Sequence, residues 1–108
     1  MRNPPIVLAS TSRYRRDLLS RLGIAFEVAA PGVDETPVAG ETPRTTAWRL
    51  AAAKARAAAA GRTEALVIGS DQVVECDGEP IGKPGSHAAA ARQLERLSGR
   101  TVVFHTGV

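Results

Sequence analysis

The segment that most constrains the fold is a short apolar run followed at once by hydroxyl residues and a helix. Ile6–Ala9 predicts a buried strand, Ser10-Thr11-Ser12 follows it, and a helix is expected from Arg13 to Leu22 with Ser12 as its N-cap. Backbone N–H groups at a helix start, together with the helix dipole, attract anions. Arginine adds a planar fork of donors that matches phosphate oxygens. The segment therefore predicts an anion site, and a nucleotide is the first ligand to consider.

The rest of the chain predicts an α/β fold with a mixed central sheet flanked by helices. Further strands are expected at Ile24–Ala29, Leu66–Ile68, Val73–Cys76 and Thr101–Phe104, and further helices from Pro43 to about Gly61 and from about His87 to Leu97. Asp77-Gly78 is a hairpin turn signal. The 108 residues are enough for one domain. Because no helix follows the last strand, we expect this domain to be incomplete at its C-terminal end.

Composition narrows the class of partner. The formal net charge of +3 is carried mainly by arginine, which suits an anionic ligand but is too small to indicate duplex nucleic acid. Cys76 is the single cysteine, so no internal disulfide can form and a reducing compartment is indicated. The N-terminus lacks an apolar signal region, and no window approaches the ~20 apolar residues of a membrane span. We expect a cytoplasmic, soluble protein that binds neither nucleic acid nor a membrane.

Helical geometry separates the arginines of the first helix. The stripe expected to be buried consists of Leu18, Leu19 and Leu22. Tyr14 and Arg15 project to the same side one turn earlier. An arginine aligned with a buried stripe needs an anionic partner, so Arg15 is the first candidate phosphate ligand. Arg16 points elsewhere and is the second candidate, because the first turn of the helix is close to any ligand at its start. Two alternatives stay open for Arg15, a carboxylate partner at the edge of the core and extension of its side chain to water.

The long second helix carries one cation on its apolar side. That side is expected to consist of Ala47, Leu50, Ala51 and Ala58. Lys54 falls in its middle, whereas Arg49 and Arg56 lie opposite and are expected to be solvated. A lysine in such a place either extends to water or carries its charge to a site. The second interpretation gains weight because a compact fold brings this helix near Glu35 and Asp71.

Three further charged residues are candidates from position. Asp71 follows an apolar strand, and ligands of α/β sheets bind beyond such strand ends. A carboxylate there can hold a divalent ion or take a proton from water, although an aspartate at that place can also simply form a turn. Lys83 lies between Gly82 and Pro84 in a loop that suits a pre-positioned charge. Glu35, in an acidic loop, is weaker by itself.

Four stretches occur in order along the chain. They are Ala9 to Leu19, Val33 to Glu35, Arg49 to Ala55, and Gly69 to Val74 with Gly82-Lys83-Pro84 behind it. In these residues the chain resembles the Maf family of nucleoside triphosphate pyrophosphatases, across essentially all 108 residues and as the N-terminal portion of a longer family domain. The resemblance implies a Maf/ITPase-like fold. It also implies hydrolysis of a nucleoside triphosphate to the monophosphate and pyrophosphate, assisted by Mg²⁺ or Mn²⁺.

The resemblance also assigns roles to individual residues. Asp71 matches the proton acceptor of the family and, with Glu35, its metal ligands. The matches to its phosphate- and metal-binding positions are Ser10, Arg15, Glu35, Lys54 and Lys83. A homodimer is implied for the full-length form. The half that this chain lacks is expected to supply further sheet and part of the base pocket, so activity of residues 1–108 alone is left open.

Two positions bear on the choice of substrate. Family members that act on dTTP and UTP carry Pro-Arg-Arg and Asp-Thr, where this chain has Arg13-Tyr14-Arg15 and Asp71-Gln72. The pattern resembles the 7-methyl-GTP pyrophosphatase branch, which carries an aromatic residue and Gln there. A methylated guanine is cationic, and the Tyr14 ring can bind it by stacking and cation–π attraction. The hypothesis is therefore hydrolysis of 7-methyl-GTP. The alternatives are dTTP/UTP hydrolysis and a non-catalytic, nucleotide-binding regulator of septum formation.

Overall fold

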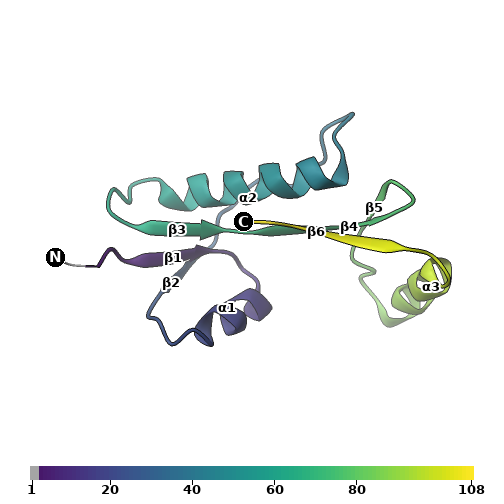
Figure 1. Ribbon diagram of the computed structural model, residues 1–108, viewed down its shortest axis with the longest axis horizontal. Helices are drawn as coiled ribbons and strands as arrows, with labels where there is room; N and C mark the ends of the chain where they lie inside the picture. Colours follow the sequence, from purple (N-terminus) through teal and green to yellow (C-terminus); the bar gives the residue numbers. More distant parts are fainter. Residues whose placement is uncertain (1–2) are drawn as a thin grey trace.

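The computed structural model describes residues 3–108, which form an elongated α/β structure with extents of 53 × 31 × 21 Å (Figure 1). The strands are β1 (Ile6–Ala9), β2 (Glu27–Ala29), β3 (Leu66–Gly69), β4 (Asp71–Cys76), β5 (Glu79–Ile81) and β6 (Val102–Gly107). The helices are α1 (Arg13–Ser20), α2 (Pro43–Ala59) and α3 (His87–Leu97). The expected α/β class is therefore confirmed. Within residues 3–108, no helix combines the length and the apolar composition needed to cross a bilayer.

Parallel and antiparallel pairing occur in two separate three-stranded sheets of the described chain. The first sheet has the order β2-β1-β3 and is parallel, with Leu8 opposite Ile68. The second has the order β5-β4-β6 and is antiparallel, with Val74 opposite both Ile81 and Phe104. Ser70 alone separates β3 from β4, so one nearly continuous extended segment links the two sheets (Figure 1). This junction brings the end of the parallel sheet next to the start of the antiparallel one.

Helix α2 packs against both sheets and completes the core. It contacts β1, β3, β4 and β6, and Figure 1 shows it running alongside β3 and β4. Its predicted apolar face is confirmed, because Ala47, Leu50, Ala51 and Ala58 are all buried. The remaining buried apolar residues are Val7, Leu8, Ala9 and Cys76. Two glycines permit the close approach: a Cβ on Gly69 would lie 2.3 Å from the Ala51 carbonyl oxygen, and one on Gly107 would lie 2.6 Å from that of Ala47.

Helix α1 differs from its prediction. It ends at Ser20, two residues earlier than expected, and none of its residues is buried. Leu18 is 41% exposed and Leu22 is 68% exposed, so the expected buried stripe is wrong for these two leucines. The apolar spacing makes the helix amphipathic, but α2 rather than α1 supplies the helical side of the core, and within residues 3–108 Leu18 and Leu22 stay exposed while Leu19 is half-buried.

Two strands also differ from the expected pattern. β2 covers only Glu27–Ala29 instead of starting at Ile24, and β5 was not expected as a strand. The turn that creates β5 was predicted correctly, since Asp77 and Gly78 adopt left-handed φ angles of 54° and 81° between β4 and β5. That pair of positive φ angles matches the twist of a tight hairpin.

Candidate active site

The turn between β1 and α1 is held by two serine side chains. Ser12 caps α1, because its side chain accepts a hydrogen bond from the Arg15 backbone N–H at 3.2 Å. The backbone N–H of Ser12 in turn donates to Ser10 Oγ at 3.0 Å, and Ser10 is buried. The predicted N-cap is confirmed. The turn is therefore rigid at the point where the first free N–H groups of the helix are exposed to a ligand.

Lys54 joins two carboxylates from different elements. Its Nζ lies 2.8 Å from Asp71 Oδ1 and 2.8 Å from Glu35 Oε1. Lys54 and Asp71 are buried, whereas the Glu35 side chain is 60% exposed. Burial alone would lower the pKa of Lys54, but the hydrogen bonds to Asp71 and Glu35 outweigh it and raise that pKa above its ordinary value. The ammonium is therefore charged, and it forms a cluster with the Asp71 and Glu35 carboxylates instead of extending to water.

The local sequence explains why this cluster forms. Lys54 lies one turn beyond Leu50 on the buried face of α2, and Gly69 lets that face approach the end of β3. Asp71 is the first residue of β4, just past the end of β3, and its side chain accepts a hydrogen bond from the ammonium there. Glu35 reaches the same point from the loop that precedes α2.

A cavity of about 760 Å³ opens over this cluster and over the start of α1. Its walls include every predicted site residue except Arg16. An adjoining cavity of about 830 Å³ shares Tyr14, Arg15 and Gln72 with it and extends over Val74 and Ile81. The first cavity is polar in its lining and the second adds apolar side chains. Volumes of this size are typical of sites for small ligands.

The predicted cations at the cavity differ in their surroundings. Arg15 is half-buried and Lys83 is exposed, and both line the two cavities. Within residues 3–108 neither has a carboxylate partner, so the carboxylate alternative for Arg15 is not what the structure shows. Arg16 is exposed and lines neither cavity, because it points away from the α1 face that Arg15 occupies. The structure thus gives no support to Arg16 as the second phosphate ligand.

Both predicted specificity residues, Tyr14 and Gln72, line both cavities. Tyr14 is 72% exposed there, which leaves its ring free to stack on a ligand. The Gln72 side-chain amide donates to Thr106 Oγ1 at 3.0 Å, a partner that the sequence did not suggest. Thr106 stands opposite Gln72 in the β4–β6 ladder, and that cross-strand pairing is what brings the two together.

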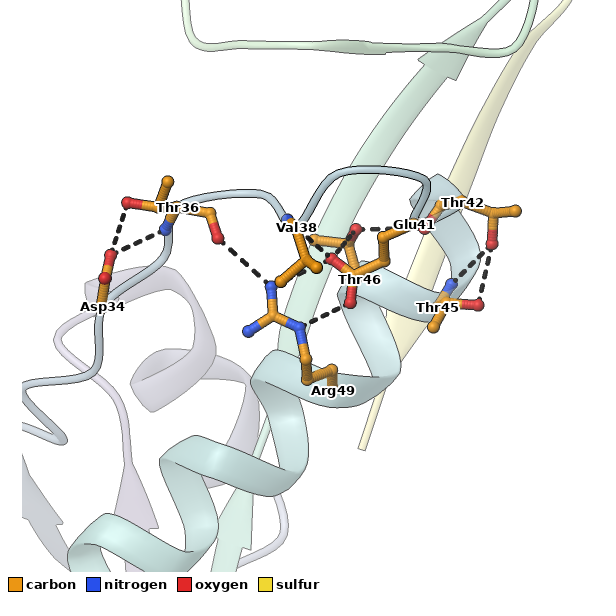
Figure 2. A network of polar contacts seen from close by, with 8 residues as sticks. All are labelled: Asp34, Thr36, Val38, Glu41, Thr42, Thr45, Thr46 and Arg49. Atoms are coloured by element: carbon orange, nitrogen blue, oxygen red, sulfur yellow. Dashed lines mark hydrogen bonds and ion pairs between the residues drawn. The ribbon is translucent and has the colours of Figure 1, made fainter.

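Arg49 is the clearest error among the predicted side-chain positions. Instead of being solvated, it donates from Nε to Glu41 Oε2 at 2.6 Å and from a terminal nitrogen to Glu41 Oε1 at 3.0 Å (Figure 2). Thr46 donates to the same carboxylate at 2.7 Å. The hydrogen bonds from Arg49 and then Thr46 lower the pKa of Glu41 to about 2. The sequence signal that was available is the spacing of Thr46 and Arg49, one turn apart on the helix that begins two residues after Glu41.

The carboxylates suit a metal held jointly with a substrate. Within residues 3–108, no three His, Cys, Asp or Glu side chains gather closely enough to form an all-protein metal cage. Glu35 and Asp71 nevertheless direct oxygens to one point at the cavity, where they now share a cation, the Lys54 ammonium. Mg²⁺ is commonly bound by one or two carboxylates that are completed by water and substrate phosphates. The donor set fits that mode.

A helix start, a half-buried arginine, two lysines and two carboxylates around one cavity are typical of α/β proteins that bind phosphorylated ligands. The family model described as Maf-like protein matches residues 5–108, and the chain belongs to the Maf family. The resemblance inferred from the four sequence stretches is confirmed.

Curated relatives agree with this assignment. The chain is 61% identical to a 7-methyl-GTP pyrophosphatase of Polaromonas sp., in a match covering 96% of the chain and 48% of the relative. It is 58% identical to proteins of the same name from Paraburkholderia xenovorans, covering 99% of the chain and 54% of the relative, and from Thiobacillus denitrificans, covering 98% and 53%. The chain therefore spans about half the length of the curated relatives it matches.

Proposed function

We propose that this chain carries the phosphate-side half of a nucleoside triphosphate pyrophosphatase that hydrolyses 7-methyl-GTP to the monophosphate and pyrophosphate. The observation that carries the proposal is the ammonium of Lys54 between Glu35 and Asp71, in a cavity that opens beside the start of α1. The names of the relatives support the same reaction and the same substrate. The buried free thiol of Cys76 fits the reducing cytoplasm, where we expect the protein to act.

In this proposal, the polar cavity holds the triphosphate. The free N–H groups at the start of α1 and the hydroxyl of Ser10 face the phosphates, while Arg15 and Lys83 neutralise their charge. Neutralising negative charge that develops during attack on phosphorus lowers the barrier, and donors that are already in place need no reorganisation. The start of α1 thus binds and orients the substrate.

Asp71 is proposed to accept the proton of the attacking water. Lys54 donates to Oδ1 of this carboxylate, which leaves Oδ2 for the water. The charged ammonium of Lys54 fixes the orientation of the Asp71 carboxylate. A Mg²⁺ or Mn²⁺ ion held by Glu35 and Asp71 would supply further charge neutralisation on the phosphates and on the departing pyrophosphate.

Base recognition is proposed to occur in the adjoining cavity. The exposed ring of Tyr14 is available to stack on a cationic methylated guanine. Gln72, whose amide nitrogen is engaged by Thr106, can present its carbonyl oxygen to donors on the base edge. Homodimerisation of the longer form stays a prediction.

The test is pyrophosphate release by the purified protein from 7-methyl-GTP, dTTP and UTP in the presence of Mn²⁺. We expect release from 7-methyl-GTP alone. Asp71→Asn should lose turnover by roughly 10²-fold or more while substrate binding is largely kept, because the carboxamide cannot take a proton. Turnover that Asp71→Asn leaves unchanged would remove Asp71 from the mechanism. Release from dTTP and UTP would favour the alternative of dTTP/UTP hydrolysis. Nucleotide binding without turnover would favour a non-catalytic regulator.

A further inference from the structure

Glu35 stands in the cluster with little packing to hold it there. Its side chain is 60% exposed, yet its carboxylate contacts the buried ammonium of Lys54. Glu35 belongs to residues 34–41, here called the acidic loop, which has neither helix nor strand. A flexible side chain on an irregular loop loses conformational entropy when it is confined to one contact. Something else must fix the backbone of this loop.

The acidic loop is fastened to α2 by a network of polar contacts (Figure 2). At its far end, the Glu41 side chain is only 7% exposed and accepts from both Arg49 and Thr46. A terminal nitrogen of Arg49 also reaches the Thr36 carbonyl oxygen at 3.4 Å. One guanidinium therefore holds the loop at two points, one of them directly next to Glu35.

The other neighbour of Glu35 is also constrained. Asp34 Oδ1 accepts from the Thr36 backbone N–H at 2.9 Å and from the Thr36 hydroxyl at 2.6 Å, which closes a tight turn around Glu35. These hydrogen bonds lower the pKa of Asp34. The turn sets the direction in which the Glu35 side chain leaves the loop, and Arg49 sets where the turn lies on α2.

We infer that Arg49 and Glu41 form a clamp that positions the acidic loop so that Glu35 reaches Lys54. Arg49 and Lys54 lie five residues apart on one helix, a rise of about 7.5 Å, so α2 carries both the clamp and the ammonium that the clamped loop must meet. Neither Arg49 nor Glu41 lines the two cavities. They are positioning residues. The inference rests on the proposed function only in giving Glu35 a task at the phosphates.

The competing explanation is that the Glu41–Arg49 pair merely stabilises the first turns of α2. The two explanations differ in what happens to each of the two contacts of Lys54. If the pair stabilises α2 alone, its loss affects the contacts of Lys54 with Glu35 and with Asp71 together. If the pair is a clamp, its loss releases Glu35 and leaves Asp71 in place, because Asp71 is fixed by β4.

The experiment is an NMR measurement of couplings across hydrogen bonds, from the Lys54 side-chain nitrogen to the carboxylate carbons of Glu35 and Asp71. Lys54 and Lys83 are the only lysines, so the ammonium signals are readily assigned with Lys83→Arg. The variants are Arg49→Ala and Glu41→Gln. The matched control is Arg56→Ala, which removes an exposed arginine from the same face of α2, two turns further on.

We expect both couplings in the unsubstituted chain and in Arg56→Ala. In Arg49→Ala and Glu41→Gln, the coupling to Glu35 should be lost while the coupling to Asp71 persists. The inference is overturned if both variants retain the Glu35 coupling, if both couplings disappear together, or if the unsubstituted chain lacks the Glu35 coupling. Should Arg49→Ala fail to fold, Glu41→Gln decides alone, because it preserves the size of the side chain and the hydrogen bond from Thr46. The measurement needs no substrate, so it is independent of whether the protein hydrolyses 7-methyl-GTP.

Discussion

Helices α1 and α2 both carry cations to the same cavity, but only α2 is packed. Seven residues of α2 are buried, among them Lys54, and no residue of α1 is. Lys54 already has two anionic partners, whereas Arg15 on α1 has none within residues 3–108. The fold itself therefore places Asp71 and Lys54 against each other. Arg15, the proposed phosphate ligand, is left to be paired by the substrate.

The largest expected effect comes from removing the buried cation of α2. Lys54→Met should lower the free energy of unfolding by about 3 kcal/mol, because Asp71 would stay buried without its partner. The α1 counterpart Arg16→Met, at an exposed position, should change it by less than about 0.5 kcal/mol. Urea unfolding of the two variants measures both values. Similar losses in the two variants would contradict the contrast between the helices.

A smaller effect is expected from disturbing the contact between α2 and the sheet. Gly69→Ala should destabilise the protein by about 2 kcal/mol, because the added Cβ would meet backbone atoms of α2 that must shift. Gly82→Ala is the control, since a Cβ there has nothing within 4 Å and the residue lies in the loop of Lys83. Thermal unfolding followed by circular dichroism compares them. A Gly69→Ala protein as stable as Gly82→Ala would mean that α2 does not press on the β3 end.

The smallest expected effect is in the response to acid. The pKa of Glu41 is lowered from 4.5 to about 2, so its ionised form stabilises the folded state fully above about pH 4.5. That contribution is lost as the pH falls from there toward 2. The urea midpoint of the unsubstituted chain should therefore decrease more between about pH 5 and about pH 3 than that of Glu41→Gln. Identical acid sensitivity would show that the Arg49–Glu41 clamp contributes nothing to stability in this pH range.

Local features of the structure could be predicted from the sequence. Ser12, Thr42 and Ser86 all cap the helices that follow them, because small hydroxyl residues before an amphipathic run accept the first free N–H groups. Lys54 could be singled out because one charge in an otherwise apolar helix face needs a partner. These conclusions depend on residues within one or two helical turns.

Non-local features could not be predicted in the same way. Helical periodicity shows which side of α2 carries Arg49. It does not show that the acidic loop folds over that side and supplies Glu41. The leucines of α1 have the spacing of a buried stripe, and spacing alone does not say what covers it. Strand signals do not reveal that β3 and β4 belong to different sheets. Each of these outcomes depends on contacts between distant segments.

In the proposed function, the triphosphate binds where the open start of α1 faces the packed cluster on α2. The most direct measurement is an NMR titration of the backbone amides with 7-methyl-GTP and Mg²⁺. We expect the shifts to concentrate in residues 10–16, 69–72 and 82–84, with α3 unchanged. Shifts centred on α3, or none at residues 10–16, would contradict it.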